Sequence, residues 1–156
     1  MHLAVLLIAV GITGSSLFKT ETLVALAAGD THTIHGYTLE YKGTQVLDEA
    51  SRRRFVASVD VYRGSARVGT LQPEKNLHWN IEQYVTEVAV RTTLAEDLYV
   101  ALDWPEENGR ATFRMNVYPL VIWLWIGVGL LLLGTLIALW PPATAQREIS
   151  DEAGSA

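Results

Sequence analysis

The 156-residue chain contains no cysteine, so it can form neither a disulfide nor a metal centre with thiolate ligands. Positive charge is also scarce, because 12 lysine and arginine residues stand against 17 acidic residues, for a formal net charge of −5. The main basic run is the arginine triplet at 52–54. Since nucleic-acid binding needs a clustered cationic surface that displaces counterions, this composition argues against a nucleic-acid partner.

Long apolar runs are confined to the two ends of the chain, and the longer one covers 117–140 without a charged residue. At about 1.5 Å per residue, a helix of this length exceeds the ~30 Å hydrocarbon core of a bilayer. Tyr118, Trp123 and Trp125 lie near its start and Trp140 at its end, as in an interfacial aromatic belt. A buried helix of a soluble protein would carry a polar stripe, which is missing here. The range 117–140 is therefore predicted to be a transmembrane helix.

The amino-terminal run, 3–14, is apolar but too short to span a bilayer as a helix. A signal peptide would begin with positive charge, and only His2 precedes this run as a possible cation. An independent anchor is disfavoured by the same short length. We therefore interpret 1–16 as the end of a longer transmembrane helix that starts outside this sequence. The polar, acidic range 141–156 is predicted to be a disordered cytoplasmic tail.

Between the apolar ends, 29–116 alternates between apolar and polar residues, the period of a strand with one buried face. The alternating segments are 37–42, 55–62, 86–91, 98–102 and 111–117. Two hairpin turns are predicted, at Gly64–Ser65 and at Asn108–Gly109, the second with positive φ at both residues. We expect a membrane-anchored, mainly β protein. Its external domain is a small sandwich or barrel of six or seven strands, preceded by a partial transmembrane helix and followed by a complete one.

No catalytic, cofactor-binding or metal-binding residue is predicted from the sequence. His32 and His35 lie three apart, so in a strand they point to opposite faces and cannot chelate one ion. They are expected to be partly exposed histidines that lead into a strand. His78 is expected in a loop, and the arginines at 52–54 on a solvated loop. The sequence has no nucleophile elbow, phosphate-binding loop or metal-binding motif.

The stretch LQPEKNLHW, at 71–79, interrupts the alternation with a proline and two opposite charges. We expect a strand end and a connection, because Pro73 cannot donate to a sheet, and an ion pair between Glu74 and Lys75 that fixes the loop. The stretch resembles a signature of the CcmF family, and other motifs of that family follow in order. The matching positions are Leu71, Pro73, Glu74, Lys75, Thr86, Glu87, Asp97, Leu98, Tyr99, Pro119, Trp123 and Trp125. Asn76 stands where the family usually has arginine.

The resemblance implies a function for the chain. CcmF proteins are large multi-pass heme lyase subunits of the bacterial cytochrome c maturation system. They receive heme from the chaperone CcmE and join it to apocytochrome c. By resemblance, this chain corresponds to their last external domain and last helix, as a fragment or as the product of a split gene. Its partners would be the rest of the heme lyase, CcmE and apocytochrome c.

The resemblance also implies where the chain lies and which part of the complex handles heme. The chain would lie in the inner (cytoplasmic) membrane, with the β domain on the periplasmic or external side. Heme would be handled by the parent complex, because the heme-ligating histidines of the family lie upstream of the matched region. The signature residues would then be structural or partner-binding.

Two alternatives belong to other functional classes. The chain could be a free-standing membrane-anchored β domain that binds a protein or peptide through a sheet edge. It could also be a self-sufficient enzyme, which the lack of a convergent acid, base, nucleophile or metal set disfavours.

Overall fold

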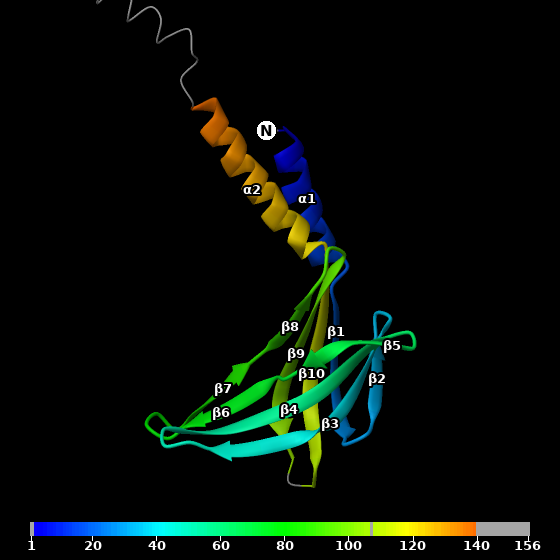
Figure 1. Ribbon diagram of the computed structural model, residues 1–156, viewed down its shortest axis with the longest axis vertical. Coiled ribbons are helices and arrows are strands. Elements are labelled where there is room, and N and C mark those ends of the chain that lie inside the picture. Colours follow the sequence, from blue (N-terminus) through cyan, green and yellow to red (C-terminus); the bar gives the residue numbers. More distant parts are fainter. Residues whose placement is uncertain (1, 107, 140–156) are drawn as a thin grey trace, which may run out of the picture.

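The computed structural model describes residues 2–106 and 108–139. Two helices, α1 (His2–Leu17) and α2 (Val121–Ala138), lie side by side at one end, and β strands form the rest (Figure 1). In chain order the strands are β1 (Thr20–Ala27), β2 (Thr31–Ile34), β3 (Tyr37–Asp48), β4 (Arg52–Arg63), β5 (Ala66–Leu71), β6 (Glu74–His78), β7 (Gln83–Glu87), β8 (Ala89–Thr92), β9 (Glu96–Pro105) and β10 (Arg110–Pro119).

The strands form two antiparallel sheets. The first has the order β1-β10-β9-β8, and the second has the order β2-β3-β4-β6-β7, with β5 also paired to β4. Strand β4 is long enough to pair with β5 through one half and with β6 through the other. As a result, the part of the second sheet that holds β6 and β7 projects to one side of the sandwich (Figure 1). We call this part the arm.

The core lies between the two sheets and is built from alternate residues, as period two requires. Tyr41 of β3 meets Phe113 of β10 edge to face, with ring centroids 5.0 Å apart, so aromatic contacts join the sheets. The core side chains that are fully buried include Leu39, Ala57, Val59, Val61, Leu98, Val100, Leu102, Ala111, Phe113, Met115 and Val117. The prediction of a small β sandwich is confirmed.

The boundaries and the strand number differ from those expected. The sheets contain ten strands rather than six or seven, since several short strands carry too few residues for a clear alternation. Strands begin at Thr20 rather than at residue 29, because β1 pairs with β10 from Arg110 to Val117. Helix α2 begins at Val121 rather than at 117, since Val117 is fully buried in the sandwich opposite Thr20. The expectations for Trp140 and for 141–156 fall outside the described residues.

The turn at Gly64–Ser65 joins β4 to β5 as predicted, with φ of 61° at the glycine. In the second turn, Gly109 has the predicted positive φ, 78°. The Asn108 side-chain oxygen accepts the backbone N–H of Arg110 at 3.0 Å, which helps to close the turn.

The two helices pack through glycines that allow close approach. A Cβ added to Gly11 would lie 2.7 Å from the backbone nitrogen of Leu124, and one added to Gly127 would lie 2.9 Å from the carbonyl oxygen of Ala4. Small residues at such positions let helix backbones meet, as in membrane helix pairs. Among the described residues, α2 is the one helix long and apolar enough to cross a membrane by length and composition. Helix α1 is shorter, and most of its large apolar side chains are exposed.

Candidate functional site

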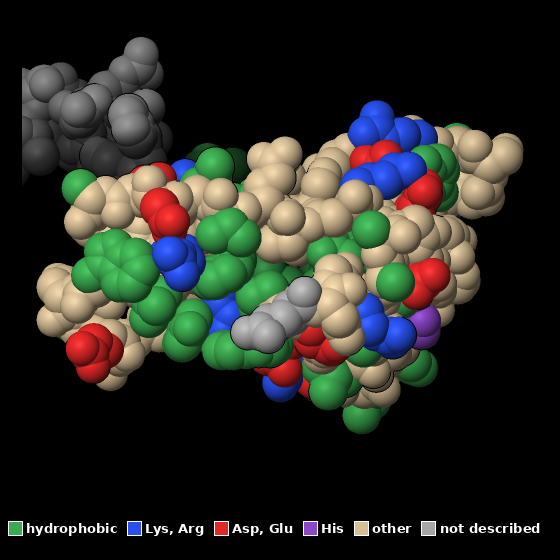
Figure 2. Space-filling view, turned by 90° about the horizontal axis from the view of Figure 1, so that it is seen from below, with side chains coloured by type: hydrophobic (Ala, Val, Ile, Leu, Met, Phe, Trp, Pro, Cys, Tyr) green, Lys and Arg blue, Asp and Glu red, His purple; other side chains and the backbone are tan. Residues whose placement is uncertain are grey.

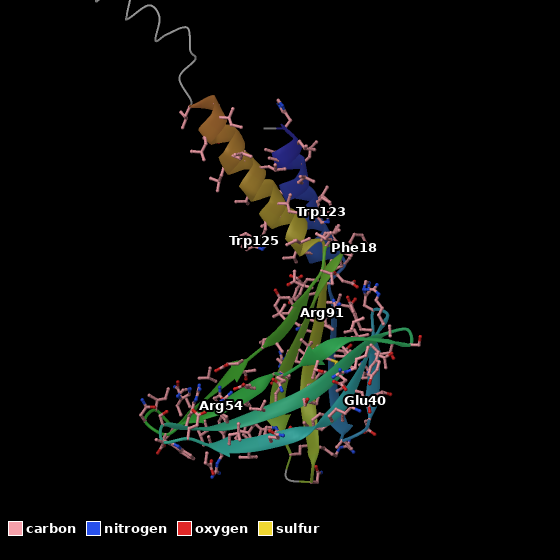
Figure 3. The ribbon with its side chains drawn as sticks, in the orientation of Figure 1. Phe18, Glu40, Arg54, Arg91, Trp123 and Trp125 are labelled. Atoms are coloured by element: carbon pink, nitrogen blue, oxygen red, sulfur yellow. The ribbon has the colours of Figure 1, made fainter. Side chains whose placement is uncertain are left out.

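The structure divides the twelve signature residues between two places. The β6–β7 cluster on the arm contains Pro73, Glu74, Lys75, Thr86 and Glu87, together with Arg54 and Asn76. Leu71, at the end of β5, leads into this cluster and belongs to the core. The junction cluster lies where β9 and β10 meet α2 and contains Asp97, Leu98, Tyr99, Pro119, Trp123 and Trp125. Figure 3 shows the separation, with Arg54 on the arm and Trp123 on α2.

Two motifs of the β6–β7 cluster are partners across a strand pair. In the register of β6 and β7, Glu74 lies opposite Glu87 and Lys75 lies opposite Thr86. Strand β5 ends at Leu71 as expected, and the carbonyl of Pro73 accepts the N–H of Ala57 at 3.0 Å. The expectation of a connection is wrong beyond this proline, because 74–78 forms strand β6.

Glu74 pairs with Arg54 and not with Lys75. Arg54 donates from Nη2 to Glu74 Oε1 at 2.6 Å and from Nε to Oε2 at 2.9 Å, a bidentate pair. Neighbouring residues of a strand point to opposite faces, so Glu74 cannot share a face with Lys75. The hydrogen bonds from Arg54 hold the pKa of Glu74 below its ordinary value, against the opposing effect of burial. The arginines at 52–54 therefore lie on strand β4, in ion pairs, and not on a solvated loop.

Lys75 faces the first sheet and ties the arm to it. Its ammonium group donates to the carbonyl oxygen of Asp103 on β9. It also lies 5.4 Å from the ring centroid of Trp104 and 6.0 Å from that of Tyr84. These two rings meet edge to face at 5.0 Å, which surrounds the lysine stem with aromatic surface.

Asn76, the position at which the resemblance predicts an arginine, is completely buried. Its Nδ2 donates to Glu87 Oε1 at 2.7 Å, while Arg54 lies directly opposite it on β4. A guanidinium, that of Arg54, therefore lies beside this position on the neighbouring strand. Sequence reasoning missed Arg54 as a partner, although the triplet at 52–54 marked the segment.

In the junction cluster, backbone contacts clamp the start of α2 to the turn between β8 and β9. The N–H of Leu120 donates to the carbonyl of Ala95 at 2.9 Å, and the indole N–H of Trp123 donates to the carbonyl of Leu94 at 2.9 Å. Leu120 has a φ of 61°, which turns the chain from β10 into the helix. Trp125, two residues after Trp123, is largely exposed.

The strand residues of the junction cluster separate by face. Leu98 is fully buried in the core, whereas Asp97 lies on the outer face and is almost fully buried opposite Tyr118. Tyr99 lies on the outer face, edge to face with Tyr118 at 5.2 Å. Burial, followed by the nearby charge of Asp97, raises the pKa of Tyr99.

A polar cluster that the sequence did not indicate surrounds Glu96, whose side chain is only 5% exposed. His35 Nδ1 lies 2.7 Å from Glu96 Oε2, and Arg63 donates to Oε1 at 2.8 Å and to the hydroxyl of Tyr37 at 3.0 Å. Burial alone would raise the pKa of Glu96, but hydrogen bonds led by that of Arg63 lower it overall. His35 follows β2 in a left-handed turn, while His32 lies within the strand. Within 2–106 and 108–139, no three acidic or histidine side chains are placed to hold a metal ion.

Comparison with known proteins assigns this geometry to a family. Residues 17–119 match the family model described as the CcmF C-terminal beta-sandwich, which spans all ten strands. The chain belongs to the CcmF C-terminal β-sandwich family. The resemblance inferred from the 71–79 stretch is thereby confirmed.

Individual relatives agree with the family match. The CcmF cytochrome c-type biogenesis protein of Pseudomonas aeruginosa is 33% identical over 137 residues, 88% of this chain and 21% of the relative. Its Escherichia coli namesake is 30% identical over 146 residues, 94% of this chain and 23% of the relative. A solved structure named Cytochrome c Heme Lyase CcmF superposes with a TM-score of 0.74 at 27% identity, over 90% of this chain and 23% of that one. The chain thus spans between a fifth and a quarter of the length of these relatives.

Proposed function

We propose that this chain acts in cytochrome c maturation as the carboxy-terminal part of a membrane heme lyase subunit. The observation that carries the proposal is the similarity to the heme lyase CcmF structure over 90% of the chain. That coverage is too large to involve the sandwich alone, so it extends beyond the family match at 17–119. Membership of the family supports the same assignment.

In this proposal α2 crosses the inner membrane of a bacterium and holds the sandwich on the periplasmic side. Helix α1 is the end of a further transmembrane helix, and its glycine-mediated contact with α2 fits two helices that meet inside a bilayer. The exposed apolar side chains of both helices suit contact with lipid or with other helices. The range 141–156 then lies in the cytoplasm.

The proposal gives this chain a supporting role in heme attachment. Heme is handled by the parent complex, and the partners are the rest of the heme lyase, the chaperone CcmE and apocytochrome c. The charges of Glu74 and Arg54 are already paired with one another, which supports a structural role for the β6–β7 cluster. In the junction cluster, the largely exposed Trp125 of α2 is placed to meet lipid or another membrane helix.

Co-purification tests this function. An affinity tag on this chain should recover the multi-pass part of the heme lyase from membranes solubilised in mild detergent. Gly127→Val, which forces apart α1 and α2, should lower the recovery and the yield of holocytochrome c, whereas Gly129→Val should lower neither, because nothing lies within 4 Å of that site. A chain that supports full cytochrome c maturation without binding any heme-handling protein would contradict the proposal.

One observation favours the alternative of a free-standing interaction module. Every residue of edge strand β7 is exposed, and large apolar side chains there include Tyr84 and Val85. Seen from the end opposite the helices, hydrophobic side chains also gather over one side of the surface (Figure 2). Exposed apolar patches of this kind mark protein-binding surfaces. If the Val85→Asp variant on the arm left the yield of holocytochrome c unchanged, binding through β7 would be separate from heme lyase function.

A further inference from the structure

A groove of about 620 Å³ lies between the helices and the outer face of the first sheet. The end of α1 and the start of α2 form its upper wall, and β9 and β10 form its floor. The lining residues are Ser15, Ser16, Lys19, Val88, Tyr99, Ala101, Arg114, Asn116, Tyr118 and Val121. The groove therefore opens at the level where the apolar helices give way to the sandwich.

Two cations line this groove, and one of them is only loosely held. The nearest carboxylate oxygens to the Arg114 guanidinium belong to Glu21, at 4.0 Å, and Asp103, at 3.7 Å. Both distances exceed that of a hydrogen bond, so the donors of Arg114 remain available. Lys19 lies 2.7 Å from the other oxygen of Glu21, which is itself 44% exposed and can turn away into solvent.

The groove also offers neutral polar groups. The Asn116 Oδ1 atom is buried and has no hydrogen-bond partner among the described residues. A buried, unpartnered amide is costly unless a ligand or water satisfies it. The outer-face rings of Tyr99 and Tyr118 flank this position, and such amphipathic rings favour the headgroup level of a membrane.

We propose that this groove binds the headgroup of an anionic phospholipid, with Lys19 and Arg114 neutralising its phosphate. The amide of Asn116 would meet the glycerol or phosphate oxygens, and the apolar walls at Val88 and Val121 would face the start of the acyl chains. This inference rests on the proposed insertion of α2 in a membrane. It is independent of the role in cytochrome c maturation. The phosphate chemistry alone would equally admit inorganic phosphate, but the apolar walls and the helix level favour a lipid.

Energy transfer measures this binding in the full chain. The protein is placed in nanodiscs of phosphatidylcholine that contain a small fraction of pyrene-labelled phosphatidylglycerol, and transfer from tryptophan to pyrene is recorded. Pyrene-labelled phosphatidylcholine gives the reference. We expect transfer to the anionic lipid at a lower mole fraction than to the neutral lipid. Lys19→Gln with Arg114→Gln should reduce this preference by about fivefold for each cation removed.

Two further variants test the geometry. Lys42 is a matched control, because it is 44% exposed and lies 2.6 Å from Glu40, much as Lys19 lies 2.7 Å from Glu21. Lys42→Gln should leave the preference unchanged, because Lys42 lies on the second sheet. Glu21→Gln should increase the preference, because it removes the carboxylate that competes with the phosphate for Lys19 and Arg114.

The possible negative results distinguish three errors, which concern the site, the lipid as the ligand and the insertion of α2. Equal transfer to both lipids, or a loss with Lys42→Gln as large as that of the double variant, would overturn the site. Displacement of the labelled lipid by inorganic phosphate at constant ionic strength would overturn the lipid as the ligand. Absence of transfer to either lipid would show that α2 is not inserted, and circular dichroism of each variant would exclude unfolding as the cause.

Discussion

The β6–β7 cluster and the groove between the helices and the first sheet both place an arginine beside a glutamate. The two regions nevertheless pair these charges differently. On the arm, Arg54 holds both oxygens of Glu74 at 2.6 and 2.9 Å. In the groove, Nη1 of Arg114 lies 4.0 Å from Oε1 of Glu21, which is beyond hydrogen-bond distance. A tightly paired charge braces structure, whereas a loosely paired charge is available to a ligand.

The difference follows from what lies beneath each surface. The arm projects beyond the sandwich, and β7 is exposed along its length. Polar contacts therefore join β4, β6 and β7, with buried Asn76 at their centre. The groove instead lies over the core-backed first sheet, so we expect its outer residues to contribute little to stability. The braced arm thus contains matched signature residues, whereas Lys19 and Arg114 of the groove lie outside the signature.

The largest effect on stability should come from breaking the braced pair. Glu74→Gln removes the charge that Arg54 binds through two hydrogen bonds, in a side chain only 15% exposed. We expect the free energy of unfolding to fall by about 2 kcal/mol, the cost of losing charge-assisted hydrogen bonds at a half-buried site. Urea unfolding of the detergent-solubilised chain, followed by circular dichroism, measures this change.

The neighbouring arginine supplies the control for that prediction. Arg53 also makes two hydrogen bonds to one carboxylate, that of Asp48, but this carboxylate is 59% exposed. Asp48→Asn should have no measurable effect, because water replaces the lost contact. Equal effects of Glu74→Gln and Asp48→Asn would mean that the arm is not braced by its paired charges.

The packing of α1 on α2 depends on the close fit of glycines and not on charge pairs. A second substitution tests this fit. Gly127→Val places its Cβ 2.9 Å from the carbonyl oxygen of Ala4, so α1 and α2 must move apart. We expect a loss of about 1–3 kcal/mol in the association of the two helices. Because the chain lacks cysteine, spin labels at Leu3→Cys and Leu133→Cys report the helix separation without background.

The label distance should lengthen and broaden in the Gly127→Val variant. Gly129→Val on the same helix is the control, because a Cβ there meets nothing within 4 Å. An unchanged distance in both variants would show that the glycines do not determine the packing of α1 on α2.

The third expected effect is a dependence of stability on pH. The pKa values of Glu74 and Glu96 lie below their ordinary value of 4.5, so the unfolded chain binds more protons than the folded chain at mildly acidic pH. Their contribution to stability is complete above about pH 4.5 and is lost as the pH falls through the lower folded-state pKa values. The free energy of unfolding should therefore decline on acidification below that point.

Urea unfolding at a series of pH values tests this dependence. The double variant Glu74→Gln with Glu96→Gln should be less stable at neutral pH and should show a shallower decline in acid. A decline as steep as that of the unmodified chain would assign the acid sensitivity to other carboxylates.

The sequence was sufficient to predict the sandwich but not its limits. Period-two alternation identified the core face of β4, with Ala57, Val59 and Val61, because a buried face and a wet face differ in composition. The same alternation could not show where β10 ends, since Val117 suits a strand or an apolar helix equally well. Strand β1 was missed because it directly follows the apolar α1 and carries its own apolar run.

The two clusters were less predictable, because their contacts join distant segments. The 71–79 stretch marked Glu74 and Lys75, but the partner Arg54 depends on the pairing of β4 with β6. The contact of His35 with Glu96 joins residues 61 positions apart, and no local pattern indicates it. Local spacing determines which face a side chain occupies, while the strand order determines what it meets there.

The smallest expected effect on stability belongs to the groove. Arg114→Gln removes a guanidinium whose closest carboxylate oxygens are 3.7 and 4.0 Å away, so the free energy of unfolding should change by no more than about 0.5 kcal/mol. Urea unfolding in neutral detergent measures this change, and the same variant is then compared in discs of neutral and anionic lipid. If Arg114 serves a ligand and not the fold, anionic lipid should stabilise the unmodified chain more than the variant. A large loss of stability in neutral detergent would place Arg114 with Glu74, among the residues that brace the sheets.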